Sequence, residues 1–350
     1  MSGSGVGSGA VGEDVAMHVW APVYATPSAG DEARALAEVG VDGVFSFEGP
    51  HDVFLPLALA ASATGLGTMT NVAIAFPRNA VHLAHAARDL QALSGGDFTL
   101  GLGSQVRTHV ERRFGVDFER PVARMRETVE AVRAILATWE TGERLDYRGE
   151  FRTHTSMSPM FSPGPSPWGP PPIMVGGLGP QMCAMAARVA DALGVMPVCS
   201  DRFFATSTLP AVEAGLARRD PSLGELEIVP EVIVACGRDA AEQAVADAGC
   251  RALLGFYLST PAYRPVFELE GFGHLQPEAQ AMTRAGRWDE LAHLVSDEVL
   301  ASVVVRGTPD EVADGIARRF GDRVSRVCTY LPYGAAEGLL ADLVAALHAR

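Results

Sequence analysis

The sequence predicts an α/β fold, a (β/α)8 TIM barrel with insertion segments, and two observations support this. Between residues 41 and 103, short apolar runs alternate with segments of helical period. Apolar runs of about five residues are typical of strands that are buried on both faces, as in parallel sheets. Along the 350 residues this alternation yields about eight strand–helix units, and a closed ring of parallel strands accommodates that number.

The elements are expected in the following order. The first half predicts strands at 15–23, 41–47, 68–76 and 97–102, and helices at 31–39, 55–63, 81–93 and 121–139. The second half predicts a strand, a glycine turn and a helix directly after Pro172, then strands at 193–198, 228–235 and 326–331, a short apolar stretch at 303–305, and a closing helix at 335–348. Thr308, Pro309 and Glu311 form the pattern of a capping box and predict a further helix start.

Residues 15–350 are expected to form one domain, preceded by a Gly/Ser-rich, disordered lead at 1–14. Two segments interrupt the strand–helix rhythm. The segment at about 145–172 contains seven prolines and predicts an irregular loop or lid. The segment at about 250–300 begins with an aromatic, turn-rich stretch and predicts helices only at 281–300. We expect it to cover one mouth of the barrel.

Composition excludes several classes of function. A net charge of -14 argues against nucleic acid or an anionic membrane as partner. No apolar run reaches the roughly 18 residues of a membrane span, and the N-terminus has no signal-peptide pattern. The five cysteines are scattered, which favours a cytoplasmic location. All 28 basic residues are arginine, so Schiff-base and Walker A chemistry are excluded.

Glycine turns follow two of the predicted strands and are candidate binding segments. One is Gly176, Gly177, Leu178, Gly179, Pro180 and Gln181, at the start of a predicted helix. It is either a phosphate-binding turn or a tight turn that needs small residues. The other is Gly103, Ser104 and Gln105. Its polar side chains could bond a cofactor, or the glycine could simply allow the strand to end there.

Glu48 and His51 follow the second predicted strand and are the best acid–base candidates, although a surface Glu–His pair is the alternative. Arg107, Arg112 and Arg113 either hold an anionic cofactor tail or pair with nearby carboxylates. No metal site is expected. His82 and His85 are three residues apart on an outer helix, where a surface pair is the simpler interpretation, and the chain has no HExxH motif.

The chain resembles the bacterial-luciferase-like flavin and deazaflavin enzymes, and more narrowly their coenzyme F420-dependent oxidoreductases. The matching segments span about 39–332 and include LGTMTNVAIAFPRNAVHLAHAARD, LSGGDFTLGLGSQV, PPIMVGGLGPQM, GRWDELAHLVSDEVL and GTPDEVADGIARRF. LSGGDFTLGLGSQV is among the most specific of these.

This resemblance implies that F420 lies across the carboxyl mouth of the barrel. It implies a phosphate site at Gly177 to Gln181, ring contacts from Gly103, Ser104 and Gln105, and a non-proline cis peptide near Asn71, Val72 and Ala73. Many relatives carry an acidic residue followed directly by histidine after the second strand. Here Glu48 matches the acidic residue, but Gly49 and Pro50 separate it from His51, and His109 is the fallback proton donor.

The function predicted from these residues is hydride transfer between C5 of the deazaflavin and a small organic substrate. Two alternatives remain, an FMN-dependent luciferase-like monooxygenase and a catalytically silent cofactor-binding homologue. The resemblance also implies a homodimer formed through outer helices.

Overall fold

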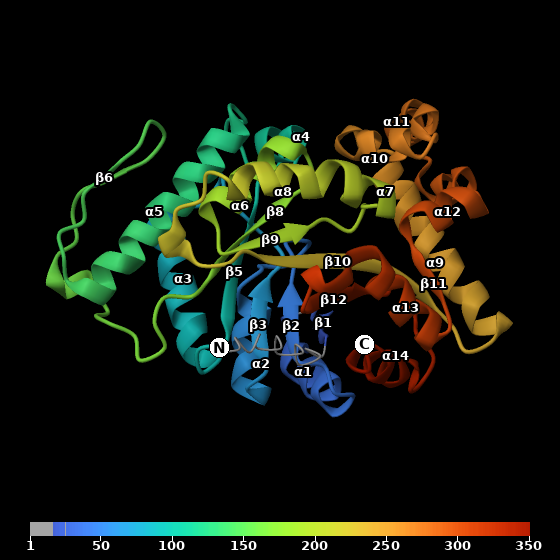
Figure 1. Cartoon of the computed structure of the whole chain (residues 1–350), viewed down its shortest axis with the longest axis horizontal. Helices are drawn as coiled ribbons and strands as arrows, with labels where there is room; N and C mark the ends of the chain where they lie inside the picture. The colour runs from blue at the N-terminus through green and yellow to red at the C-terminus, as the bar shows by residue number, and fades with distance from the viewer. Residues whose placement is uncertain (1–16, 25) are drawn as a thin grey trace, which may run out of the picture.

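The computed structural model describes residues 17–24 and 26–350, so the predicted lead at 1–14 lies outside the described residues. Parallel strands close into a ring at its centre (Figure 1). In ring order they are β1 (His18–Pro22), β2 (Gly43–Ser46), β3 (Gly67–Thr70) continued by β4 (Ala73–Ile74), β5 (Phe98–Gly103), β8 (Ile173–Gly177), β9 (Ala192–Val195), β10 (Glu227–Cys236) and β12 (Arg326–Tyr330). The pairing of β12 with β1 closes the ring and confirms the predicted (β/α)8 barrel.

Helices surround this ring. They are α1 (Ala29–Glu38), α2 (Leu55–Thr64), α3 (Ala80–Leu93), α4 (Arg107–Arg112), α5 (Pro121–Thr141), α6 (Pro180–Val189), α7 (Asp201–Phe203), α8 (Leu209–Leu216), α9 (Ala240–Leu258), α10 (Arg264–Leu269), α11 (Gln276–Arg284), α12 (Asp297–Val303), α13 (Pro309–Phe320) and α14 (Leu339–His348). The capping box predicted at Thr308 is present at the start of α13. No helix in the described part of the chain is both long and apolar enough to cross a bilayer.

Successive layers of side chains fill the ring. An apolar layer consists of Trp20, Phe45, Met69, Met174, Ala192, Val229 and Cys328. Because side chains alternate between the faces of a strand, residues two positions later also point inward. The next layer, nearer the carboxyl ends of the strands, therefore includes Phe47, Asn71, Gly176, Glu231 and Tyr330. This second layer contains polar groups and forms the floor of the barrel mouth.

Trp20 explains why two neighbouring strands begin with glycine. A Cβ atom added at Gly43 would lie 2.5 Å from the indole, and one at Gly67 would lie 2.9 Å from it and closer still to the Asp97 carboxylate. The glycines give the ring room inside the barrel, where Arg326 stacks on it at 4.7 Å from the centroid. The small residues on two strands thus complement the large side chain of a third strand, so the requirement comes from filling the barrel interior and not from the strands individually.

The structure corrects three of the expected elements. The strand expected at 68–76 is divided into β3 and β4 by residues 71–72. The segment at 145–172 contains a short antiparallel hairpin, β6 (Tyr147–Arg148) with β7 (Thr153–His154), on the left of Figure 1. The expectation that 250–280 is irregular is wrong, because α9 continues through Leu258 and α10 and α11 follow it. The division into a barrel with insertions at about 145–172 and 250–300 stays a prediction.

Gly255 led to the wrong expectation for this segment, because glycine is typical of turns. A Cβ there would lie 2.8 Å from backbone atoms of Leu291, so the glycine allows α9 to pack closely against residues 288–294. Close helix packing, rather than a chain reversal, is the reason for a small residue at this position.

Candidate functional site

The interruption between β3 and β4 is a bulge at the carboxyl mouth. Met69 pairs with Thr99 and Ala73 pairs with Leu102, so four steps along one strand match three along its neighbour. The peptide bond between Asn71 and Val72 is cis, at the place where the resemblance implied one.

Thr70 joins the two strands where the backbone ladder is broken. Its hydroxyl accepts from the backbone N–H of Gly101 at 2.8 Å and donates to the carbonyl of the same residue at 2.7 Å. A Cβ at Gly101 would lie only 1.8 Å from the carbonyl oxygen of Thr70. The first glycine of the sequence GLG is therefore required by the bulge.

Val72 brings three of the candidate segments together. A Cβ at Gly103 would lie 2.3 Å from its Cγ2 atom, and a Cβ at Gly176 would lie 3.3 Å from its Cγ1 atom. The Val72 side chain also packs on the apolar layer inside the barrel. Residues 71–73, 103–105 and 176–177 thus form one continuous rim across β4, β5 and β8.

Ser104 and Gln105 follow β5 on this rim. Gln105 has a φ of 56°, which is uncommon for a residue with a side chain, and its Oε1 accepts from the backbone N–H of Val106 at 2.8 Å. The Ser104 hydroxyl donates to the Gln105 carbonyl at 3.2 Å. These side chains shape the turn itself, and both residues are half-buried.

The second glycine turn leads from β8 into α6. Gly177 is closely packed, since a Cβ there would lie 3.0 Å from Cys183 Sγ. Gly179 is the N-cap of α6 and supplies no side-chain cap, while Pro180 and Gln181 begin the helix. Backbone N–H groups at such an uncapped helix start favour an anion. Leu178 lies in the turn, between β8 and the N-cap.

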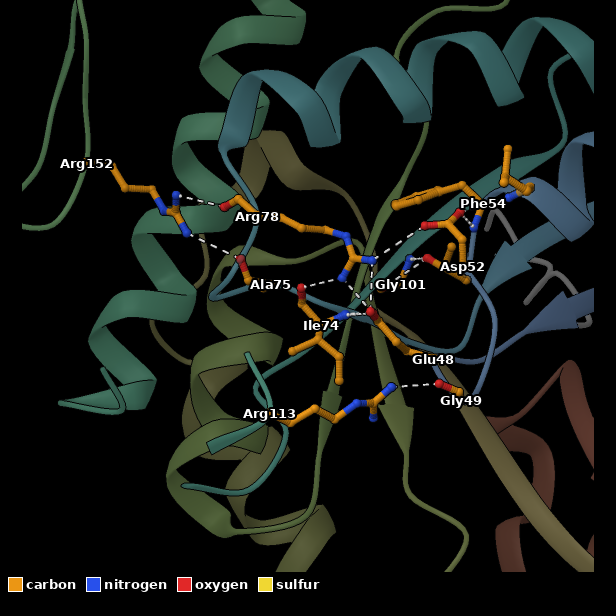
Figure 2. A network of polar contacts seen from close by, with 12 residues as sticks. Glu48, Gly49, Asp52, Phe54, Ile74, Ala75, Arg78, Gly101, Arg113 and Arg152 are labelled. Carbon is orange, nitrogen blue, oxygen red and sulfur yellow. Dashed lines mark hydrogen bonds and ion pairs between the residues drawn. The ribbon is translucent and has the colours of Figure 1, made fainter. Parts of the chain in front are cut away.

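Glu48 is held in a tight polar network (Figure 2). Its Oε2 accepts from the backbone N–H of Ile74 at 2.9 Å and from Arg78 Nη1 at 2.6 Å, and its Oε1 accepts from Arg78 Nη2 at 2.9 Å. Its side chain is only 8% exposed. Arg78 Nη1 also donates to the Ile74 carbonyl at 2.9 Å, so the pair clamps the backbone directly after the bulge. A carboxylate with both oxygens bound in this way is suited to positioning the rim.

Replacing Glu48 by glutamine is expected to lower the free energy of unfolding by about 2–3 kcal/mol, because Arg78 would keep its charge without its carboxylate. Chemical denaturation measures this. The matched control is Glu111→Gln, which breaks the exposed pair with Arg107 and should change stability by less than about 0.5 kcal/mol. If the two substitutions lowered the free energy of unfolding equally, the Glu48–Arg78 pair would not stabilise the backbone after the bulge as described.

The two histidine candidates lie in different surroundings. His51 is exposed in the loop between β2 and α2 and makes no hydrogen bond or ion pair within the described part of the chain. His109 lies on α4, half-buried, and its Nδ1 is a buried atom without a partner among the described residues. The segment after β2 is also tied down by Arg113, which donates to the Gly49 carbonyl at 2.7 Å.

A glutamate that the sequence analysis missed occupies the floor of the mouth. Glu231 lies on β10, two residues after Val229 of the apolar layer. Asn71 Nδ2 donates to Glu231 Oε2 across the barrel at 3.1 Å, which links the bulge to the opposite strand. Burial raises the pKa of Glu231 to about 8, and the Asn71 hydrogen bond lowers it only in part. The sequence did contain a signal for this residue, because Glu231 is the only charged residue in the apolar run at 228–235.

Four tyrosine side chains lie near the Glu231 carboxyl. The proximity of Glu231 adds to burial in raising the pKa values of Tyr24, Tyr257, Tyr263 and Tyr330. Tyr257 and Tyr263 come from α9 and the turn after it, with ring centroids 5.0 Å apart. Residues of the segment at 250–300 thus lie near Glu231, and its covering of the mouth stays a prediction.

Comparison with known proteins shows the family of this chain. A family model described as luciferase-like monooxygenase matches residues 16–326. The chain belongs to this family. An uncharacterized Mycobacterium tuberculosis protein is 42% identical over 300 residues, covering 85% of this chain and 88% of the relative. A second protein of that organism, whose name proposes a coenzyme F420-dependent oxidoreductase, is 30% identical over 301 residues, covering 81% and 84%.

The fold is also shared with a solved structure. The coenzyme F420-dependent tetrahydromethanopterin reductase from Methanopyrus kandleri superposes with a TM-score of 0.78, at 15% identity, covering 95% of this chain and 97% of that one. The match extends over nearly the whole chain, so the second half, with α9 to α12, belongs to the shared architecture.

Other candidate residues of this luciferase-like chain have partners within the protein. Arg107 pairs with Glu111 at 2.7 Å and Arg113 donates to the Gly49 carbonyl, and both interpretations of the arginine group stay predictions. His85 packs on Trp139, with ring centroids 4.7 Å apart. Within residues 17–24 and 26–350 no cluster of three or more His, Cys, Asp or Glu side chains could hold a metal ion.

A separate cleft of about 590 Å³ lies outside the barrel, between α5, α6 and α8. Its lining includes Arg120, Arg126, Arg188, Arg218 and Gln181. Gln181 is thus a residue of the predicted phosphate turn that also borders this outer cleft.

Proposed function

We propose that the chain is a coenzyme F420-dependent oxidoreductase that transfers a hydride between C5 of the deazaflavin and a small organic substrate. The observation that carries this proposal is the rim on which Val72 abuts Gly103 and Gly176. Membership of the luciferase-like family and the name of the relative at 30% identity support the choice of an oxidoreductase and of F420.

The rim suits a flat ring with a phosphorylated tail. Gly103 and Gly176 make room for the Val72 side chain, which lies where a Cβ atom at Gly103 would be, so Val72 can pack closely against both strands and offer an apolar surface to a planar ligand. The uncapped start of α6, from Gly179 to Gln181, lies at the end of the same rim and would hold the phosphate. We propose that Asn71, Val72 and Ala73 support the ring and that Ser104 and Gln105 border it.

When bound, the deazaflavin supplies hydride chemistry and no oxygen adduct. The protein contributes position and a surface shielded from water. Glu48 acts through Arg78 and Ile74 to fix the bulge, and we propose it as a positioning residue. Tyr257 and Tyr263 close the mouth from the side of α9 and would limit the size of the substrate.

A cofactor titration tests the proposal. We expect F420 to bind and its deazaflavin absorbance to change on addition of an acceptor or donor substrate, and we expect FMN to bind at least tenfold more weakly. Oxygen uptake that depends on reduced FMN would instead establish the monooxygenase alternative, which the family description favours. Tight F420 binding without turnover across a broad substrate panel would identify a silent homologue.

We also propose a homodimer that uses α2. Leu55 and Leu59 are 57% and 44% exposed on this helix, which carries no charged residue. Light scattering is expected to give twice the chain mass of 36.9 kDa for the wild type and one chain mass for the double variant Leu55→Glu/Leu59→Glu. The control is Leu216→Glu, a similarly exposed leucine on α8. A monomeric wild type would contradict the proposal.

The five cysteines are all buried and unpaired. We propose a cytoplasmic location, because a reducing compartment keeps such thiols free.

A further inference from the structure

Among the described residues, Glu231 is the one carboxyl in the second layer of the barrel mouth, and the proposed function has not used it. We propose that Glu231, in its neutral form, is the catalytic acid that gives a proton to the substrate, and that Asn71 is the residue that positions it. This inference rests on the proposed function, since the hydride must come from a reduced deazaflavin.

The position of Glu231 carries the argument. Val229 belongs to the apolar layer, so Glu231 points into the same lumen one layer nearer the mouth. Its Oε2 is fixed by Asn71 at 3.1 Å, directly beside the Asn71–Val72 bulge. Its Oε1 has no hydrogen-bond partner among the described residues and remains available to a substrate. The residue keeps partial exposure, which the mouth provides.

The surroundings favour the protonated state. Five titratable groups face Glu231, and they come from the segment after β1, from α9 and its following turn, and from β12: Tyr24, Tyr257, Tyr263, Tyr330 and Cys328. All of these are neutral when protonated, and within the described residues no arginine or histidine pairs with the carboxyl. Burial without a cation raises the pKa of Glu231 to about 8. By contrast, Glu48 is bound to Arg78 through both oxygens.

When bound in its reduced form, the deazaflavin would supply a hydride, with its two electrons, for a substrate carbon that is doubly bonded to oxygen or nitrogen. The O–H bond of Glu231 breaks, the proton bonds to that oxygen or nitrogen, and the carbon–heteroatom π bond is lost. The substrate is reduced, the deazaflavin is oxidised, and the Glu231 carboxylate takes a new proton from water.

Infrared difference spectroscopy of the cofactor-free protein tests the protonation state directly. We expect the carbonyl band of a protonated carboxyl near neutral pH, and its loss as pH rises through about 8. The band should be absent in Glu231→Gln and unchanged in Glu225→Gln, an exposed glutamate two residues before β10. In Asn71→Ala the midpoint should rise, because the Asn71 hydrogen bond lowers this pKa. A wild type without the band at neutral pH, or a band that survives in Glu231→Gln, would overturn the proposal.

Stopped-flow kinetics with reduced F420 test the catalytic role. We expect hydride transfer in Glu231→Gln to be slower by roughly 10²–10⁴-fold, with F420 affinity within about threefold of the wild type. Glu225→Gln should match the wild type in both. A Glu231→Gln protein that transfers hydride at the wild-type rate would contradict the inference while leaving the proposed function intact. Failure of the wild type to bind F420 would defeat the proposed function, whatever the infrared result.

Discussion

Replacing Gly101 by alanine is expected to destabilise the protein by roughly 3 kcal/mol or more. The added methyl group would lie 1.8 Å from the carbonyl oxygen of Thr70. That oxygen belongs to the backbone, so it cannot rotate away as a side chain would. The Thr70 hydroxyl, which bonds both the N–H and the carbonyl of Gly101, would have to move as well. Denaturant unfolding monitored by circular dichroism measures the loss.

Gly334→Ala is the matched control, because a Cβ at that exposed glycine would meet nothing within 4 Å. It should change the free energy of unfolding by less than about 1 kcal/mol. If Gly101→Ala were as stable as this control, the bulge between β3 and β4 could not have the described geometry.

The second large effect is a loss of stability as pH rises from about 5 to about 8. Burial raises the pKa of Glu231 from its ordinary value of 4.5 to about 8. In this window the folded chain keeps a proton that the unfolded chain has released, so the stabilisation present below about 4.5 is lost as pH rises toward 8. Each tenfold difference in proton affinity is worth about 1.4 kcal/mol. We therefore expect wild type to lose on the order of 3 kcal/mol relative to Glu231→Gln.

Unfolding free energies of wild type, Glu231→Gln and Glu225→Gln, measured at several pH values, separate this effect from the other titrations. Glu225→Gln should follow the wild type, whereas Glu231→Gln, whose neutral amide resembles the protonated carboxyl, should match the wild type near pH 4.5 and exceed it by a growing margin toward pH 8. A difference that stays constant over this range would show that Glu231 is already ionised at low pH.

Much of the barrel could be predicted from the sequence because buried parallel strands are short apolar runs. The runs at 43–47 and 98–102 and the capping box at Thr308 all lie where they were expected. The long helix α9 was missed because Gly255 and the residues after it resemble turn signals. Its glycine instead serves a contact with Leu291, which no local pattern reveals.

The candidate site was predictable in part. The glycines at 103 and 176 and the bulge at Asn71–Val72 lie on one rim. The interactions of Glu48 could not be read from the sequence, since its partner Arg78 is 30 residues away. Glu231 was missed because a strand buried on both faces has no alternation that says which side chains enter the lumen. Glu231 faces Asn71 only because the strands close into a barrel, which brings β10 opposite the bulge.

A crystal structure of the protein with bound F420 tests the central claim most directly. The account predicts the deazaflavin ring against Val72, bordered by Gly103 and Gly176, with its phosphate at the start of α6 and Glu231 facing the substrate space beside the ring. A cofactor found outside the barrel mouth, for example in the cleft between α5, α6 and α8, would contradict it.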